Sequence, residues 1–140
     1  MTTGHCLCGT VRVTLTDAPA EMHACHCEIC RRQGLIGFSV QVPEGEISIS
    51  GDTIRTYASS DWGHRAFCGT CGTNLWFRLN EGGPYFLSPG LLDDMTGLAL
   101  ADEIFIDRKP AGYALAGERP RLTGDEFYKM IASSSEGGQP

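Results

Sequence analysis

Three cysteines stand within six residues of one another, in the segment Cys25-His26-Cys27-Glu28-Ile29-Cys30. Sulfurs this close along the chain can all face one metal ion, but they leave a tetrahedral zinc shell one ligand short. Structural zinc sites use four protein ligands, whereas catalytic sites use three and keep the fourth position open. The segment therefore predicts a zinc ion with one open position, where a small thiol could bind as the nucleophilic thiolate.

The other four cysteines form two pairs in distant parts of the chain, and each pair is followed directly by a glycine: Cys6, Cys8 and Gly9, then Cys68, Cys71 and Gly72. Glycine lets the chain turn tightly around a metal because it tolerates backbone angles that other residues resist. Four thiolates would close a tetrahedral shell and make a structural site. Cys25 and Cys27 could instead share a shell with either pair, but the division into four and three keeps each pair as a local clamp.

Two other interpretations of the cysteines remain open. A single cysteine is often a small buried apolar residue, although seven clustered cysteines fit that interpretation poorly. An iron–sulfur cluster would use the same ligands, but its usual runs of four cysteines are absent from the sequence.

Charge and composition narrow the environment and the partners. Seventeen acidic and eleven basic residues give a formal net charge of −6, so nucleic acid is not an expected partner. The first residues lack the pattern of a signal peptide, and no apolar run approaches the roughly 20 residues that span a bilayer. We therefore expect a cytoplasmic protein without a membrane segment, in which reduced thiols serve as metal ligands rather than forming disulfides.

The elements that must position the cysteines are expected to be mostly strands, because eighteen glycines and seven prolines interrupt the chain too often for long helices. A strand at 21–24 would lead into Cys25. The segments 38–42, 47–50 and 53–57 indicate a meander with turns at 43–45 and 51–52. Further strands are expected at residues 11–16, 74–79, 85–88 and 103–106.

Helices are expected in two places only. Residues 28–33 indicate a short helical turn at and after Cys30, ended by Gly34. Residues 125–131 indicate a short C-terminal helix, with Thr123 as its N-cap and acids in its first turn. Residues 1–132 are expected to form a single domain of a size that can bury a modest core, and 133–140 a disordered tail.

Charged residues beside the cysteines could have accessory roles. His26 is a candidate proton shuttle, but the alternation of an extended chain directs its side chain away from both neighbouring sulfurs and favours a non-ligand role. Arg31, Arg32 and Arg65 could offset thiolate charge or bind a substrate carboxylate, or they could be solvated surface charge. Glu28 has no assigned role.

Other residues near the cysteines are expected to be structural. His5 and His64 flank the two clamps, but neither is needed to complete a shell. Most of the nearby aromatic residues are expected in the core, although one could line a substrate cleft: Trp62, Phe67, Trp76 and Phe77.

In order along the chain, four motifs resemble those of the glutathione-dependent formaldehyde-activating (Gfa-like) family: Gly-x-Cys-x-Cys-Gly-x-Val, Cys-His-Cys-x-x-Cys-Arg-Arg, Ser-Ser, and Arg-x-Phe-Cys-x-x-Cys-Gly. Here they are carried by Gly4, Cys6, Cys8, Gly9, Val11, Cys25, His26, Cys27, Cys30, Arg31, Arg32, Ser59, Ser60, Arg65, Phe67, Cys68, Cys71 and Gly72. The resemblance runs from about residue 4 to 79, more weakly to about 110, and includes all seven cysteines.

This resemblance implies a mainly β fold, the Mss4-like β-tent of short antiparallel strands. It also implies a structural zinc at Cys6, Cys8, Cys68 and Cys71, and a second, labile catalytic zinc at Cys25, Cys27 and Cys30. The namesake activity joins glutathione to formaldehyde, gives S-(hydroxymethyl)glutathione, and is classed with carbon–sulfur lyases. The chain is therefore expected to be a carbon–sulfur lyase that acts on a glutathione-like thiol and an aldehyde.

Two interpretations from other classes compete with an enzyme. A non-catalytic zinc-binding module that presents a surface to a partner protein would need only the closed four-cysteine site. A zinc-ribbon nucleic-acid binder is disfavoured by the acidic balance and by the lack of basic residues interleaved with aromatic ones.

Overall fold

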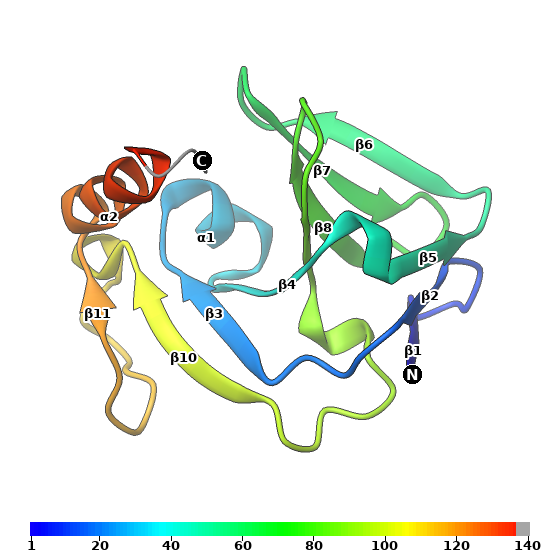
Figure 1. Ribbon diagram of the computed structural model, residues 1–140, viewed down its shortest axis with the longest axis horizontal. Coiled ribbons are helices and arrows are strands. Elements are labelled where there is room, and N and C mark those ends of the chain that lie inside the picture. The colour runs from blue at the N-terminus through cyan, green and yellow to red at the C-terminus, as the bar shows by residue number, and fades with distance from the viewer. Residues whose placement is uncertain (137–140) are drawn as a thin grey trace. The chain divides into compact units, whose positions relative to one another are not determined.

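The chain folds into two compact units. The computed structural model describes residues 1–136, with 134–136 described by backbone only. The first unit contains Met1–Met22 and Ser39–Ala99, and the second contains His23–Phe38 and the chain from Leu100 onward. Within the described residues, eleven strands accompany two α-helices, which confirms the mainly β expectation (Figure 1). The single-domain organisation of residues 1–132 stays a prediction.

A small antiparallel sheet in the first unit has the strand order β1-β2-β5. Its strands are β1 (Thr2–His5), β2 (Arg12–Leu15) and β5 (Ile47–Ser50). Val13 and Leu15 of β2 are buried and alternate with more exposed residues, as the pattern at 11–16 predicts. Gly4 of β1 packs directly against the backbone of Leu91, so the strand approaches this segment more closely than a side chain would allow.

The first unit also contains antiparallel strands in the order β4-β9-β8-β7-β6. Their bounds are β4 (Gly37–Val42), β9 (Tyr85–Leu87), β8 (Asn74–Leu79), β7 (Gly63–Cys68) and β6 (Ile54–Ala58). Two 3₁₀ helices, η1 (Glu44–Glu46) and η2 (Pro89–Leu91), lie in the connections. The strand β7, which ends at Cys68, has no counterpart among the strands expected from the sequence.

The predicted meander is wrong, because its three strands have different partners. β4 pairs with β9, β5 pairs with β2, and β6 pairs with β7. Alternation of apolar and polar residues determines which face of a strand is buried, but it does not select the neighbouring strand.

The core of the first unit includes metal-ligand candidates as well as aliphatic side chains. Cys6 and Cys68 are completely buried there, beside residues such as Val11 and Leu75. The other buried members of this core are Val13, Leu15, Val40, Val42, Ala66, Trp76, Leu87, Leu91 and Leu92. The cysteines are thus fixed by apolar packing as well as by their own loops.

The second unit is built on strands in the order β11-β10-β3. They are β3 (Glu21–Cys25), β10 (Ala99–Ile104) and β11 (Arg121–Leu122), and β11 runs parallel to β10. The strand predicted at 21–24 is confirmed. The strand predicted at 103–106 ends two residues early, because Phe105 adopts a left-handed backbone (φ 58°) and begins η3 (Ile106–Arg108).

Helix α1 (Glu28–Gly34) follows β3 directly and contains Cys30. It begins at Glu28, as the predicted range 28–33 does, but it has seven residues and is longer than a single turn. Gly34 is its last residue rather than its stop, because the chain leaves the helix at Leu35, whose φ is 77°.

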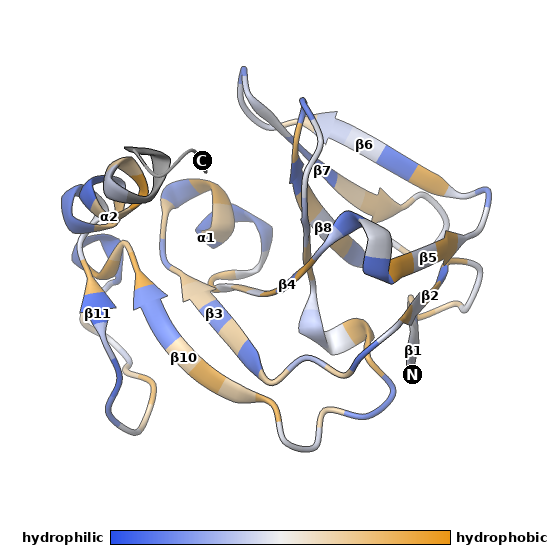
Figure 2. Cartoon of the chain, viewed as in Figure 1, coloured by the Kyte–Doolittle hydropathy of each residue, from blue (hydrophilic) through white to orange (hydrophobic). Residues whose placement is uncertain are grey.

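Helix α2 (Gly124–Glu136) lies near the end of the chain. Thr123 and Glu126 form a reciprocal capping box, with N···O distances of 2.8 and 3.1 Å, which confirms Thr123 as the N-cap. Apolar and polar residues are mixed along α2 (Figure 2), and Phe127 packs on Phe105. The predicted disordered tail is wrong for 133–136, which are helical, and its remainder lies outside the described residues. Neither described α-helix has the length and apolarity to cross a bilayer.

Candidate metal centres

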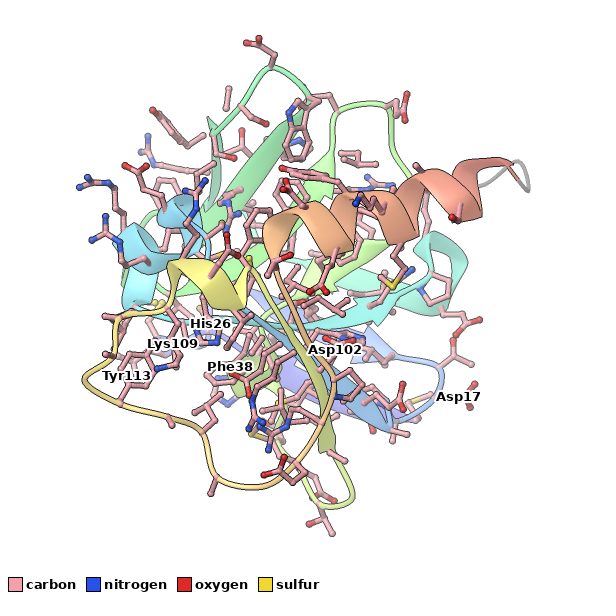
Figure 3. The ribbon with its side chains drawn as sticks, turned by 90° about the vertical axis from the view of Figure 1, so that its left-hand side faces the viewer. Asp17, His26, Phe38, Asp102, Lys109 and Tyr113 are labelled. Carbon is pink, nitrogen blue, oxygen red and sulfur yellow. The ribbon has the colours of Figure 1, made fainter. Side chains whose placement is uncertain are left out.

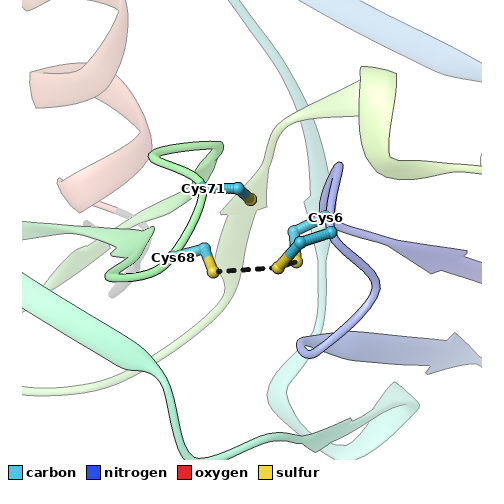
Figure 4. A group of neighbouring side chains, drawn as sticks. Cys6, Cys68 and Cys71 are labelled. Atoms are coloured by element: carbon cyan, nitrogen blue, oxygen red, sulfur yellow. Dashed lines mark hydrogen bonds between the residues drawn. The ribbon is translucent and has the colours of Figure 1, made fainter.

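The four cysteines of the two distant pairs meet in the first unit. Cys6 and Cys8 follow β1, Cys68 ends β7, and Cys71 lies in the next turn. Their sulfurs all lie within 4.8 Å of one another. Figure 4 shows the loops after β1 and β7 directing Cys6, Cys68 and Cys71 toward one point. The structure thus brings together the four residues that the spacing assigned to one shell.

The distances between these sulfurs fit a tetrahedral metal ion rather than a disulfide. Sγ of Cys8 lies 3.7 Å from Sγ of Cys6 and 3.8 Å from Sγ of Cys68. A zinc–sulfur distance of about 2.3 Å gives tetrahedron edges of about 3.8 Å. A disulfide would need about 2.05 Å, and none of the seven cysteines forms one.

Both clamps end in a glycine with a left-handed backbone, although the second turn is one residue longer than the first. Gly9 and Gly72 have positive φ angles of 84° and 81°. Each donates its backbone N–H to the carbonyl of the first cysteine of its pair, Gly9 to Cys6 at 3.0 Å and Gly72 to Cys68 at 2.8 Å. The expectation that these glycines permit tight turns is confirmed.

Threonine hydroxyls surround the four sulfurs. The Thr53 hydroxyl lies 3.3 Å from Sγ of Cys68 and, with the backbone N–H of Cys71, lowers the pKa of Cys68 to about 5. The hydroxyl of Thr73 accepts the backbone N–H of Leu7 and lies 3.2 Å from Sγ of Cys71, whose pKa it lowers to about 7. These contacts favour the thiolate form that binds metal.

The interpretation of the sequence missed these threonines, although the sequence contains a local signal for two of them. Cys8-Gly9-Thr10 and Cys71-Gly72-Thr73 repeat one pattern, and in both the hydroxyl lies near the sulfur two residues earlier, at 3.1 and 3.2 Å. Thr53 comes from a different segment, and no local pattern marks it.

The three remaining cysteines meet in the second unit, with their sulfurs within 4.8 Å of one another. Cys25 is the last residue of β3, Cys27 is the N-cap of α1, and Cys30 lies inside the helix. Sγ of Cys27 accepts the backbone N–H of Cys30 at 3.4 Å. Cys30 is buried, whereas Cys25 and Cys27 are half-buried. One strand end and one helix turn therefore direct three sulfurs to a common point.

Two of these thiols have strongly shifted pKa values. Hydrogen bonds from the Cys25 and Cys30 thiols lower the pKa of Cys27 to about 2, while contacts with Cys27 and Cys30, together with burial, raise the pKa of Cys25. A divalent cation would displace the remaining protons, so the donor set fits a metal such as zinc.

His26 lies between two of these cysteines and is nearly completely buried. Its Nε2 lies 2.9 Å from Oε1 of Glu103, and its Nδ1 lies 3.3 Å from the hydroxyl of Tyr113. Figure 3 shows His26, Lys109 and Tyr113 grouped together. Both ring nitrogens therefore have partners other than a metal, which agrees with the predicted non-ligand role.

The other charged candidates have ordinary structural contacts. Arg32 pairs with Glu28 at 3.1 Å on the exposed face of α1. His5 and His64 contact the Cys6 carbonyl and the Asn80 side chain, which supports their structural interpretation.

Two further arginines and four aromatic residues are singled out by the sequence. Arg31 is exposed on α1, whereas Arg65 stacks over Phe77 in the first unit, 5.0 Å from the ring centroid. Trp76 is buried as expected, and Phe67 and Phe77 are half-buried. Trp62 is 58% exposed in a surface loop and makes a T-shaped ring contact with Phe77.

Comparison with known families now adds to this geometry. Residues 1–108 match the family described as glutathione-dependent formaldehyde-activating enzyme. The chain belongs to this enzyme family, as its cysteine motifs predict.

Individual relatives agree with this assignment. A protein of Schizosaccharomyces pombe named as an uncharacterized lyase is 32% identical over 130 residues, covering 91% of this chain and 95% of its own. A Podospora anserina protein, provisionally named a glutathione-dependent formaldehyde-activating enzyme, is 34% identical over 87 residues. That match covers 58% of this chain and only 41% of the relative.

A solved structure supports the fold. The crystal structure of a Rhodobacter sphaeroides protein matches with a TM-score of 0.56 and 21% identity, covering 71% of this chain and 99% of the other. At this identity, the likeness concerns the fold alone.

Proposed function

We propose that this protein is a zinc-dependent carbon–sulfur lyase that adds a small thiol to an aldehyde. The observation that carries the proposal is the group of three sulfurs where β3 meets α1, which offers a metal three ligands and, among the described residues, no fourth. Membership of the glutathione-dependent formaldehyde-activating enzyme family supports glutathione and formaldehyde as the first substrates to test. A cytoplasmic location is part of the proposal, because reduced thiols are needed.

The proposed reaction forms one carbon–sulfur bond and needs no oxidant. The thiol sulfur attacks the aldehyde carbon, and the thiol proton ends on the former carbonyl oxygen. The product is a hemithioacetal, which for formaldehyde is an S-hydroxymethyl adduct. The reverse direction breaks the same bond. A zinc ion held by Cys25, Cys27 and Cys30 would supply Lewis acidity that favours the thiolate form of the substrate.

The protein's own residues would hold the ion and shape its surroundings. Hydrogen bonds from the Cys25 and Cys30 thiols lower the pKa of Cys27, which favours its role as a thiolate ligand. Cys30 is fixed by helix α1, and Cys25 by the end of β3. The remaining four cysteines are proposed to bind a structural zinc that stabilises the first unit.

The proposal is tested by giving the zinc-loaded protein glutathione and formaldehyde and following the adduct by NMR exchange spectroscopy. We expect exchange faster than the spontaneous reaction, in proportion to enzyme concentration, and abolished in Cys27→Ser. Exchange at the spontaneous rate at every enzyme concentration would refute this substrate pair.

A non-catalytic zinc-binding module is the second candidate, because the closed four-cysteine group could serve it alone. Metal analysis before and after mild chelation separates the two. The enzyme needs two ions of unequal lability, whereas the module needs only one tightly held ion.

A further inference from the structure

A buried carboxylate in the second unit has no assigned role in this proposed chemistry. Glu103 of β10 is 1% exposed, yet it is charged and fully surrounded by partners. Oε1 faces Nε2 of His26 at 2.9 Å, and Oε2 accepts from Nη1 of Arg119 at 2.7 Å and from Nε of Arg121 at 3.0 Å. Burying a charge costs several kcal/mol unless it is well paired, so such a cluster in a small unit calls for a physical reason.

The charges of this cluster determine how His26 is held. Two guanidinium groups already offset the single carboxylate, although Arg121 also faces the exposed Glu118 at 3.6 Å. A ring that donates Nε2–H to Oε1 of Glu103 can accept the hydroxyl hydrogen of Tyr113 at Nδ1, 3.3 Å away. Both edges of the ring are fixed.

The loop that carries Tyr113 is attached to the same cluster. Arg119 donates to the carbonyl of Ala116, and Arg121 donates to the carbonyl of Gly117 at 2.7 Å. Lys109 donates to the carbonyl of Tyr113 and lies over its ring, 4.5 Å from the centroid. The arginines that hold Glu103 thus also hold the chain just after Tyr113, while Lys109 holds Tyr113 itself.

The backbone of His26 is fixed as well, because its N–H donates to the carbonyl of Ile104 at 3.0 Å. His26 stands directly between Cys25 and Cys27, so its main-chain position sets the directions in which both neighbouring side chains leave the backbone. The two sulfurs are half-buried at the start of a short helix, where a strand ends and a new turn begins. A ring held on both edges stabilises this junction.

A neighbouring pair on the same two strands provides an internal comparison. His23 and Asp102 are in contact at 3.0 Å, with side chains 34% and 26% exposed. Among the described contacts, only the buried pair of His26 and Glu103 lies directly beside the cysteines and also contacts two arginines. Comparing substitutions in the two pairs therefore distinguishes a role in positioning the cysteines from a general role in holding β3 to β10.

We propose that Glu103 and Tyr113 are positioning residues for the three-cysteine site and act through His26, which they hold by its two ring nitrogens. This inference rests on the proposed metal site of Cys25, Cys27 and Cys30, and concerns how tightly that site binds its ion. Residues that orient metal ligands from outside the coordination shell commonly change affinity by 10–100-fold when they are substituted.

The test compares Glu103→Gln with Asp102→Asn, the matched change in the exposed pair. After mild chelation removes the labile ion, Co²⁺ is titrated into each protein in competition with a chelator, and the visible d–d bands are recorded. We expect Glu103→Gln to weaken Co²⁺ binding about 10–100-fold and to alter the bands. Asp102→Asn is expected to leave both unchanged, and the tightly held first ion is expected to stay bound in both.

Equal Co²⁺ affinity and identical bands in folded Glu103→Gln would overturn the inference, as would an equal loss in Asp102→Asn. If Glu103→Gln does not fold, Tyr113→Phe decides, because it removes one hydroxyl from a half-buried ring. We expect this variant to bind Co²⁺ several-fold more weakly, and unchanged binding would overturn the inference. If the parent protein binds no second ion, it is the proposed function that fails.

Discussion

A Cβ atom on Gly37 would lie 2.5 Å from Sγ of Cys30 and 2.7 Å from its Cβ. Contacts under 3.0 Å are essentially never seen for real Cβ atoms, so one of the two residues would have to move. Cys30 is buried in α1 and cannot retreat without separating its sulfur from those of Cys25 and Cys27. Gly37 therefore leaves the space that the third sulfur occupies.

Gly37→Ala is expected to weaken metal binding at the three-cysteine site by at least about tenfold without removing a ligand, in the range seen for residues outside the coordination shell. The measurement is zinc affinity in competition with a chelator. Gly34→Ala is the matched control, because a Cβ at Gly34 meets nothing within 4 Å. Equal affinities in the two variants would show that Cys30 tolerates the displacement.

Removing one cysteine from each group should have unequal effects on stability. Cys68→Ser takes a ligand from a group embedded in the core of the first unit and is expected to lower Tm by more than about 10 °C, because structural zinc sites contribute many kcal/mol. Cys27→Ser is expected to lower Tm by only a few degrees. Thermal denaturation with parallel zinc analysis checks both, and similar losses would contradict the division into a structural and a labile site.

Stability should fall on acidification in a way that depends on Glu103. Burial raises the pKa of this carboxyl, but hydrogen bonds from His26, Arg119 and Arg121 outweigh it and hold the pKa below the ordinary value of 4.5. Because the folded pKa lies below the unfolded one, the contribution is complete above about pH 4.5 and is lost as pH falls through the folded pKa. Urea unfolding between about pH 3 and 6 measures it.

Glu103→Gln supplies the comparison for this measurement, with the labile ion removed from both proteins beforehand. The parent should exceed the variant in free energy of unfolding near pH 6, and the difference should shrink toward pH 3. A difference that does not vary with pH would mean that the ionisation of Glu103 contributes nothing to stability.

The close approach of Gly4 to Leu91 predicts a change in stability that does not involve the metals. A Cβ at Gly4 would overlap the Leu91 carbonyl, so Gly4→Ala is expected to destabilise the protein by about 1–3 kcal/mol or more. Gly90→Ala, in the neighbouring η2, meets nothing within 4 Å and serves as the control. Chemical denaturation of the two variants gives the difference, and equal midpoints would argue against a tight contact.

The features that sequence predicted well depend on neighbours along the chain. The grouping of the cysteines follows from short spacings, since Cys6 with Cys8 and Cys68 with Cys71 each form a local turn. The capping of α2 by Thr123 is equally local. Single strands such as β5 and β8 match their expected ranges for the same reason.

The features that sequence could not predict depend on partners from distant segments. β4, β5 and β6 lie close to their expected ranges, but their pairing depends on which apolar faces meet after folding. Thr53 reaches Cys68 across the first unit, and Glu103 and Tyr113 reach His26 across the second. Asp102 and Glu103 are adjacent acids in β10, and no local pattern marks Glu103 rather than Asp102 as the buried one.

The four-cysteine group lies entirely in the first unit, and the three-cysteine group entirely in the second. On the proposed function, zinc starvation would empty the three-cysteine site before the four-cysteine site, leaving a folded protein that lacks only its catalytic zinc and recovers activity when zinc returns. Proteolysis responds to unfolding rather than to lost catalytic competence, so cellular quality control would leave the idle protein in place. Its abundance would then be a poor guide to its activity.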